Sequence, residues 1–279
     1  MSKAILITGG TGSFGSAFCR NIVKSDDYKK IIVFSTSWEK QTALRNELDN
    51  PKHMRWFIGN VRDYERLYQA FEGVDIVIHA AAIKCIVTCQ NDPEEALKTN
   101  AIGTQNVIRA AINRNVNKVL LISTDKAVSP INTYGATKAL AENLIINANN
   151  YKGAKDIRFS VCRYGNVVGS AGSVLPVWKK MMQEGVKSLP VTDERMTRFW
   201  FPMQEAIKFV LESLDKMQGG EIFIPEIASI RITDLAKALN MPYHIVGLRK
   251  GEKIHESLSM EYSSDKNRFL SVEEIQKMF

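Results

Sequence analysis

The sequence predicts an α/β fold, a doubly wound parallel sheet followed by a smaller C-terminal lobe. Apolar runs of strand length alternate with amphipathic stretches of helix length along the first part of the chain. These runs are apolar throughout, which is typical of strands whose two faces are both covered by helices. A glycine-rich turn between the first strand and the first helix indicates the same fold class.

The elements follow in order along the 279 residues. The predicted strands cover residues 5–7, 30–34, 54–58, 75–79, 119–123 and 159–163. The predicted helices between them cover residues 13–24, 38–48, 63–72, 92–114 and 133–150. A glycine and serine loop at 165–173 precedes a helix at 174–184, a helix at 203–217, a strand at 221–224 and a capped helix at 233–239. We expect a main domain at residues 1–164 with a return segment at 200–228, and a smaller lobe at residues 165–199 and 229–279.

The composition is that of an ordinary globular protein, with 45% hydrophobic and 24% charged residues. The net charge of +7 suits an anionic ligand, but Lys and Arg are spread along the chain, so we expect no nucleic-acid partner. The chain has no run of about 18 apolar residues and no secretory-signal pattern at its start. We therefore expect no membrane partner and a cytoplasmic protein.

The cysteines are few and widely spaced. They stand at positions 19, 85, 89 and 162, and no pair has the two-residue spacing of a structural zinc site. We expect reduced thiols and no bound metal.

The turn after the first strand reads Thr-Gly-Gly-Thr-Gly-Ser-Phe-Gly at residues 8–15. Gly9 allows a tight turn, Gly12 lets the backbone approach a diphosphate, and Gly15 lets the helix lie close to the strand. A glycine turn between a strand and a helix is how a chain seats the diphosphate of a dinucleotide. The predicted cofactor contacts here are Gly9, Thr11, Gly12, Ser13, Phe14 and Gly15.

A second group of polar residues begins where the fifth predicted strand ends. Thr124 closes that strand, and Tyr134 and Lys138 follow on the next predicted helix. Tyr and Lys four positions apart share one helix face, so we expect the ammonium to favour the phenolate form of Tyr134. Tyr134 would then exchange a proton with a substrate hydroxyl. The alternative is an ordinary surface pair and a strand-end hydroxyl.

The combination of TGxxGxxG with YxxxK resembles the extended, sugar-nucleotide-modifying branch of the short-chain dehydrogenase/reductase superfamily. The resemblance implies a Rossmann sheet, an NADP-binding domain at residues 1–164 and a substrate-binding lobe. It also implies that Thr124, which stands at the position of the family's Ser or Thr, is catalytic together with Tyr134 and Lys138.

A closer resemblance is to the inverting UDP-N-acetylglucosamine 4,6-dehydratases. It is carried by Ser-Thr-Asp-Lys-Ala at 123–127, Arg-Tyr-Gly-Asn-Val-Val-Gly at 163–169, and the motifs at 193–200 and 249–256. The family removes hydride from sugar C4, abstracts the C5 proton, expels the C6 hydroxyl as water and returns hydride to C6. By this resemblance Lys126 is the C5 base, which inverts C5, and Asp125 is the acid for the departing hydroxyl.

Lys126 needs a lowered pKa to act as a base, and we expect Lys138 and a charged nicotinamide to lower it. The alternative reading of Asp125 and Lys126 is an ion pair that stabilises a turn.

The resemblance also implies a UDP-sugar site. Its expected contacts are Lys84, Asn166, Val191, Thr192, Arg198, Arg249 and Glu252. Guanidinium groups suit a diphosphate because they donate forked hydrogen bonds. This chain has Lys84-Cys85 where the family often has Lys-His, and Asn100 is expected to order backbone rather than touch substrate.

Cofactor choice depends on the end of the second strand. No Asp or Glu stands there to bind a free ribose 2′-hydroxyl, so we expect NADP, with NAD as the alternative. The family's Arg is replaced by Thr36, and its Asp by Asn60, which can still accept a hydrogen bond from adenine. The other expected cofactor contacts are Ser35, Thr36, Ser37, Lys40, Asn60, Val61, Ala80, Ala81, Ala82, Lys84, Tyr134 and Lys138.

The expected function is therefore a UDP-N-acetylglucosamine 4,6-dehydratase with C5 inversion. A UDP-sugar 4-epimerase is the rival enzyme, and a catalytically silent nucleotide-binding protein is the rival from another class. Between residues 258 and 262 the chain is shorter than the family, which implies a trimmed C-terminal lobe. We expect a homo-oligomer, a dimer or higher, packed through the helices near 92–114 and 133–150.

Overall fold

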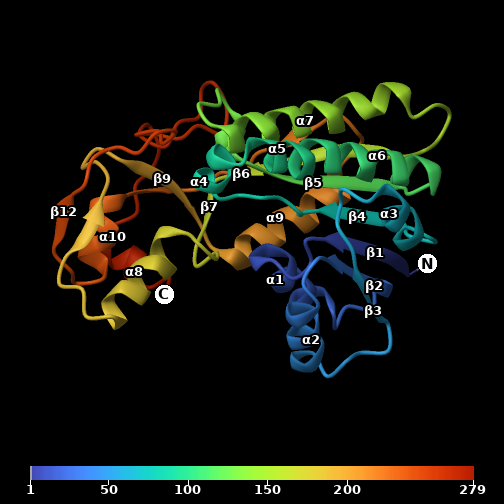
Figure 1. Cartoon of the computed structure of the whole chain (residues 1–279), viewed down its shortest axis with the longest axis horizontal. Helices are drawn as coiled ribbons and strands as arrows, with labels where there is room; N and C mark the ends of the chain where they lie inside the picture. The colour runs from blue at the N-terminus through green and yellow to red at the C-terminus, as the bar shows by residue number, and fades with distance from the viewer. Residues whose placement is uncertain (1) are drawn as a thin grey trace.

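The computed structural model describes residues 2–279, and its centre is a seven-stranded sheet (Figure 1). The strands are β1 Lys3–Thr8, β2 Tyr28–Ser35, β3 Met54–Ile58, β4 Ile76–His79, β5 Lys118–Thr124, β6 Arg158–Tyr164 and β10 Ile222–Phe223. Their order is β10-β6-β5-β4-β1-β2-β3, and every neighbouring pair is parallel. The predicted fold class is confirmed. Because the order reverses between β1 and β4, a ligand crevice is expected at their carboxyl ends.

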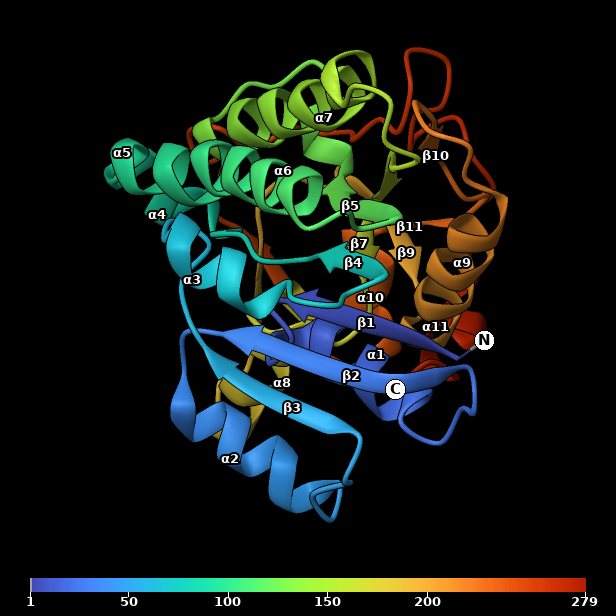
Figure 2. The same cartoon turned by 90° about the vertical axis from the view of Figure 1, so that its right-hand side faces the viewer.

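Helices cover both faces of this sheet (Figure 2). One layer contains α1 Ser13–Ile22, α2 Trp38–Glu47 and α9 Met203–Lys216, and the other contains α3 Tyr64–Ala70, α6 Gly103–Asn113 and α7 Thr133–Tyr151. The alternation of β1 shows how the strand serves both layers: Ile5 and Ile7 join the first apolar cluster, whereas Leu6 joins the second. Both faces of the strand are thus buried, as the continuous apolar runs predict.

The helix expected at 92–114 is divided in the structure. It consists of α5 Pro93–Ala96, a π-helix at Leu97–Ile102 and α6, and a further helix, α4 Ile86–Asn91, precedes it. Asp92 caps α5 through the Glu95 N–H, and Pro93 occupies the first turn. The π-helix turns Asn100 into the protein interior, where the side chain is 1% exposed.

The smaller lobe has a core of its own, which includes Trp178, Leu189, Trp200 and Leu235. Its elements are β7 Asn166–Val167, α8 Val174–Gln183, β8 Leu189–Val191, β9 Thr197–Phe201, β11 Ser229–Arg231, α10 Ile232–Ala238, β12 Tyr243–Ile245 and α11 Val272–Gln276. The strands of the lobe form a three-stranded sheet, β11-β9-β7, and a two-stranded sheet, β12-β8. The segment between the lobe's parts returns to the main sheet, because α9 shares an apolar cluster with α1 and β10 pairs with β6.

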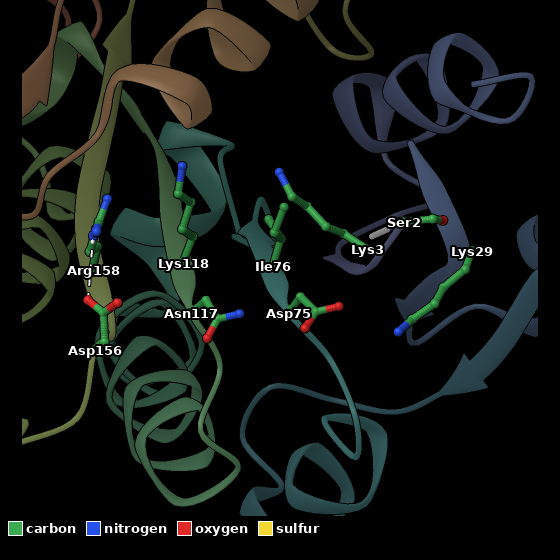
Figure 3. A pocket seen from close by; sticks show the side chains of 9 residues that line it. All are labelled: Ser2, Lys3, Lys29, Asp75, Ile76, Asn117, Lys118, Asp156 and Arg158. Atoms are coloured by element: carbon green, nitrogen blue, oxygen red, sulfur yellow. Dashed lines mark ion pairs between the residues drawn. The ribbon is translucent and has the colours of Figure 1, made fainter. Parts of the chain in front are cut away.

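The amino edge of the main sheet carries a cavity of about 460 Å³ (Figure 3). Its charged lining is formed by Lys3, Lys29, Asp75, Lys118, Asp156 and Arg158. This cavity lies at the edge opposite the carboxyl ends of the strands, so it is separate from the polar groups at the end of β5. Within residues 2–279, no helix is both long enough and apolar enough to cross a bilayer.

Candidate active site

The glycine turn between β1 and α1 is built as the sequence predicts. Gly9 has a φ of +67°, and a Cβ there would lie 2.8 Å from the Ala81 nitrogen. A Cβ on Gly15 would overlap the Gly9 carbonyl oxygen, whereas a Cβ on Gly12 would meet only that oxygen, at 3.1 Å. No side chain caps the N-terminus of α1. Its first N–H groups and the open face of Gly12 therefore fit a dinucleotide diphosphate.

The loop after β4 is fixed against this turn by buried polar groups. The Thr8 hydroxyl accepts a hydrogen bond from the Ala81 N–H at 3.3 Å and contacts His79 Nδ1 at 2.7 Å. Burial, assisted by the Lys138 charge, lowers the pKa of His79 to about 3, so its imidazole is neutral. These bonds hold the predicted cofactor residues Ala80 and Ala81 beside Gly9, and Ala82 follows them in the same loop.

Asn100 continues this support toward the next helix. Its side chain accepts from the Ile83 N–H at 2.8 Å, donates to the Ile83 carbonyl at 3.0 Å and donates to Thr137 Oγ1 on α7 at 3.0 Å. The amide therefore orders backbone. Lys84 follows directly, and desolvation lowers its pKa.

At the predicted adenosine site, two of the serines expected to bind the cofactor form hydrogen bonds within the protein. Ser35 is buried, and Gln41 donates to its hydroxyl at 3.0 Å. Ser37 caps α2 by accepting from the Lys40 N–H and donates its own hydroxyl proton to Glu39 at 2.8 Å. Thr36 and the Lys40 side chain are exposed.

Asn60 uses its amide oxygen locally. That oxygen accepts from the Arg62 backbone N–H at 3.0 Å and from the Arg62 Nε at 3.3 Å, which places it in a turn rather than leaving it free for adenine as expected. Val61 is buried, and its carbonyl accepts a bond from Asn106 at 3.1 Å.

The polar groups expected to be catalytic meet at the carboxyl end of β5. Thr124 ends the strand, and a short 3-10 turn, Asp125–Ala127, carries Asp125 and Lys126. Thr124 Oγ1 donates to Asp125 Oδ1 at 2.9 Å, and Lys126 Nζ lies 3.1 Å from the same oxygen. Asp125 is 1% exposed, and its Oδ2 has no hydrogen-bond partner among the described residues.

The helix that carries Tyr134 begins beside this turn because Asn132 caps it. The Asn132 side chain accepts from the Gly135 N–H at 2.7 Å and donates to the Gly251 carbonyl at 2.7 Å. A Cβ on Gly135 would overlap the Lys126 carbonyl, so the helix packs directly on the turn Asp125–Ala127, called the catalytic turn below for its expected role. One side chain thus connects this helix start with the C-terminal segment at 249–256.

Lys126 has a different electrostatic setting from the one expected. Burial alone would lower the pKa of Lys126, but Asp125 and Glu256 outweigh burial and the Arg198 charge, so the pKa is raised. The expectation that Lys138 lowers the pKa of Lys126 is therefore wrong, whereas the effect expected from a charged nicotinamide stays a prediction. Lys126 is an ammonium group held between two carboxylates.

Tyr134 is also perturbed. Burial raises its pKa to about 12, although the Lys126 charge and a hydrogen bond with Thr124 oppose this shift. Lys126 is the cation that most favours the phenolate form of Tyr134. Lys138 donates from Nζ to the Ile122 carbonyl at 2.7 Å, and burial lowers its pKa to about 8 against the charge of Glu142.

Glu256 is the site residue that the sequence alone did not single out. It is 2% exposed, and its Oε1 lies 3.1 Å from Lys126 Nζ. Its position in the 249–256 motif was visible, but its contact with a lysine 130 residues earlier depends on the tertiary fold.

Arg198 braces the same segment rather than standing free. Its guanidinium donates to the carbonyls of Thr197, Lys253 and Ile254 at 2.7 to 3.0 Å. Lys253 in turn donates from Nζ to the Val128 carbonyl at 2.6 Å. These bonds attach the C-terminal segment to the loop that follows the catalytic turn.

The remaining predicted substrate residues are placed unevenly. Asn166 follows β6, and Glu252 and the exposed Arg249 lie on the braced segment. Val191 is 0% exposed in the core of the lobe, and its carbonyl accepts from the Val246 N–H, so the expected ligand contact of this side chain is wrong. The adjacent Thr192 is only partly buried.

Relatives of known name match most of the chain. The UDP-N-acetylglucosamine 4,6-dehydratase (inverting) of Campylobacter jejuni is 51% identical over 256 residues, which are 91% of this chain and 76% of that protein. A UDP-glucose 4-epimerase of Rickettsia rickettsii is 42% identical over 267 residues, 92% of this chain and 78% of that protein. The predicted resemblance to the inverting dehydratases is confirmed.

Solved structures agree with the fold. Pen from Bacillus thuringiensis has a TM-score of 0.94 and 35% identity, covering 99% of this chain and 96% of that chain. DesIV of Streptomyces venezuelae, a dTDP-glucose 4,6-dehydratase with NAD and TYD bound, has a TM-score of 0.83 at 20% identity and covers 99% and 95%. Because the profile of the polysaccharide biosynthesis protein family matches residues 5–277, this chain belongs to that family.

Proposed function

We propose that this protein is a UDP-N-acetylglucosamine 4,6-dehydratase that inverts C5. The observation that carries the proposal is the group at the end of β5, where Asp125 and Lys126 lie in contact beside Tyr134. Elimination needs a second acid and base in addition to the tyrosine that serves oxidation. The 51% identical Campylobacter relative bears the same activity in its name.

In the proposed reaction Tyr134 exchanges a proton with the sugar C4 hydroxyl. A nicotinamide cofactor, when bound, would supply the hydride chemistry: a hydride is taken from C4 at the start and given to C6 at the end. Burial raises the pKa of Tyr134 to about 12, so the phenol has to give up its proton before the phenolate can accept the proton of the C4 hydroxyl. Lys126 and the Thr124 hydroxyl are the groups that stabilise the phenolate when the proton leaves.

Asp125 and Lys126 carry out the elimination in this proposal. A ketone at C4 acidifies the C5 hydrogen, which neutral Lys126 removes, and Asp125 gives a proton to the departing C6 hydroxyl. The inverted C5 centre forms when Lys126 returns a proton to the face of C5 opposite the one from which the hydrogen was removed.

The proposed cofactor and substrate sites use both parts of the molecule. Residues 1–164 with 200–228 would bind the dinucleotide, and residues 165–199 with 229–279 the UDP-sugar. On the substrate side Arg249 is free to meet a diphosphate, whereas Arg198 shapes the site through the carbonyls that it binds. Asn166, Thr192, Glu252 and Lys84 complete the proposed sugar-nucleotide contacts.

We propose NADP as the cofactor. The end of β2 supplies hydroxyl groups and no carboxylate. The exposed Lys40 lies in the first turn of α2, shortly after the end of β2, where it can pair with a 2′-phosphate. The alternative, NAD, gains support from Glu39, whose carboxylate is bonded to Ser37. Titration of the cofactor-free protein with each nucleotide distinguishes them, and a Lys40→Ala variant should weaken NADP but not NAD.

The rival function is 4-epimerisation, because the Rickettsia relatives carry that name. An epimerase rotates a 4-keto sugar and needs no acid or base for C5 and C6. The contact between Asp125 and Lys126 favours elimination.

The test uses Lys126→Ala and Tyr134→Phe with UDP-N-acetylglucosamine. We expect Lys126→Ala to retain slow C4 oxidation, seen as reduced-cofactor absorbance, and to form no dehydrated product. Tyr134→Phe should lose both steps. Wild-type dehydration by Lys126→Ala would refute the assigned role, and conversion of substrate by the wild type to its C4 epimer without loss of water would establish the rival function.

A further inference from the structure

Lys126 lies between two buried carboxylates, and only one of them has a place in the proposed reaction. Nζ is 3.1 Å from Asp125 Oδ1 and 3.1 Å from Glu256 Oε1. The Lys126 side chain is 16% exposed, whereas those of Asp125 and Glu256 are 1% and 2% exposed. Charges this close interact strongly when they are largely shielded from water, so the Glu256 carboxylate affects the protonation of Lys126.

Glu256 is held in place by its own set of bonds. Its backbone N–H donates to Ser264 Oγ at 3.0 Å, and its carbonyl accepts from the Ser264 N–H at 2.8 Å. Ser264 Oγ also contacts Thr197 Oγ1 on β9 at 2.7 Å. The carboxylate therefore reaches the catalytic turn from a braced hairpin, and its Oε2 has no hydrogen-bond partner within residues 2–279.

Four charged or titratable groups surround the Lys126 ammonium, and they come from four different parts of the chain. Asp125 comes from the same turn and Glu256 from the C-terminal segment, while Arg198 on β9 opposes both of them. Tyr134 on α7 is the fourth neighbour, and its phenol is affected by the Lys126 charge. Two carboxylates against one guanidinium leave the ammonium form favoured.

We propose that Glu256 is a positioning residue for dehydration, one that holds Lys126 Nζ against Asp125 and keeps a shared proton on that pair. This inference rests on the proposed function. Glu256 itself neither gives nor takes a proton.

The proton shared by Lys126 and Asp125 can produce both the base and the acid that elimination needs. Transfer of a proton from the Lys126 ammonium to Asp125 across the 3.1 Å contact converts ammonium and carboxylate into amine and carboxylic acid, with no change in total charge. The amine is then the C5 base and the carboxylic acid is the donor to the C6 hydroxyl. The pair needs its proton for this, and the negative charge of Glu256 retains the proton to higher pH.

The test is the pH dependence of elimination in Glu256→Gln, which keeps the side-chain shape and removes the charge. Two rates are measured from about pH 7 to about pH 10: the rate of deuterium incorporation at C5 and the rate of oxidation at C4. The ratio of the first rate to the second is then plotted against pH. The ratio cancels the titration of Lys138 and Tyr134, which affect oxidation. We expect the ratio to fall at a pH lower by about 1–3 units in Glu256→Gln than in the wild type.

Three variants separate charge from structure. Glu256→Asp keeps the charge but places it farther from Lys126, so the ratio should fall at a pH only slightly below that of the wild type. Ser264→Ala removes the hydrogen bonds to the Glu256 N–H and to Thr197 without removing the charge, so it should lower stability and shift the ratio less than Glu256→Gln does. Glu221→Gln is a matched substitution at a carboxylate that bonds Ser160 on β6, away from the site, and should leave the ratio unchanged.

An unshifted ratio in folded Glu256→Gln, or an equal shift in Ser264→Ala, would overturn the proposal. If Glu256→Gln does not fold, Glu256→Asp decides: its longer contact with Lys126 should move the ratio slightly to lower pH, and no movement would count against the role. A wild-type protein that forms no dehydrated product would instead reject the proposed function itself.

Discussion

Lys126 and Lys138 have opposite electrostatic surroundings although both ammonium groups are largely buried. Two carboxylates raise the pKa of Lys126, whereas burial lowers the pKa of Lys138 to about 8 with only Glu142 opposing it. Lys126 is thus firmly charged, and Lys138 titrates near physiological pH. In the proposed reaction Lys126 exchanges a proton with Asp125, whereas the Lys138 ammonium donates to the carbonyl of Ile122.

The depressed pKa of Lys138 has a cost in stability with a definite sign. Its pKa of about 8 in the folded protein lies below the usual 10.5, so the unfolded chain binds more protons between these values. Stability from this group is therefore lowest below pH 8 and recovers as the pH rises toward 10.5. We predict that Lys138→Met is inactive yet more stable than the wild type at pH 7, by about 1–3 kcal/mol.

Urea unfolding at pH 7 and at about pH 10 checks this prediction. The advantage of Lys138→Met should shrink at the higher pH because the wild-type lysine is then largely neutral. A constant difference at both pH values would show that the folded protein does not depress the pKa of Lys138.

At the scale of elements, the catalytic turn, the start of α7 and the C-terminal segment depend on one cap. Asn132 accepts from Gly135 within the helix and donates to Gly251 outside it. We predict that Asn132→Ala lowers the free energy of unfolding by about 1–3 kcal/mol. It should also raise KM for the UDP-sugar, because Arg249 and Glu252 lie on the released segment.

Asn132→Asp separates the two roles. The carboxylate still caps α7 but cannot donate to Gly251, so it should keep most of the stability and share the raised KM. If KM stays at the wild-type value in both variants, the cap does not position the substrate segment.

The glycine turn permits a matched comparison between two alanine substitutions. Gly15→Ala places a methyl group against the Gly9 carbonyl and should destabilise the fold, visible as a lower Tm. Gly12 has a φ of −72° and more room, so Gly12→Ala should fold but lose at least about tenfold in cofactor affinity. Calorimetric titration with NADP checks the second outcome; full binding by Gly12→Ala would place the diphosphate elsewhere.

At the scale of the whole molecule, exposed apolar side chains lie on neighbouring helices beside the main sheet. Leu97 is 42% exposed, Ile102 43% and Leu140 44%. Such residues support the proposed association of two copies through these helices. We predict that Leu140→Lys shifts the protein to monomers in light scattering, while Lys208→Glu, on the solvent side of α9, leaves the oligomeric state unchanged. Equal masses for Leu140→Lys and the wild type would exclude this surface.

The main sheet could be predicted from sequence because its strands are continuous apolar runs and its turn has a distinctive glycine spacing. The lobe could not be predicted in the same detail, since β7, β8, β11 and β12 contain only two or three residues each and show no period. The residues proposed to be catalytic followed from local motifs. Glu256 and the brace at Arg198 did not, because both depend on contacts between segments that are distant in sequence.

The most direct test of the central claim is mass spectrometry of the wild-type protein with UDP-N-acetylglucosamine in heavy water, with and without added NADP. The account predicts loss of one water and gain of deuterium at C5, with NMR showing the inverted C5 epimer. An unchanged nucleotide-sugar mass, with or without conversion to UDP-N-acetylgalactosamine, would contradict it.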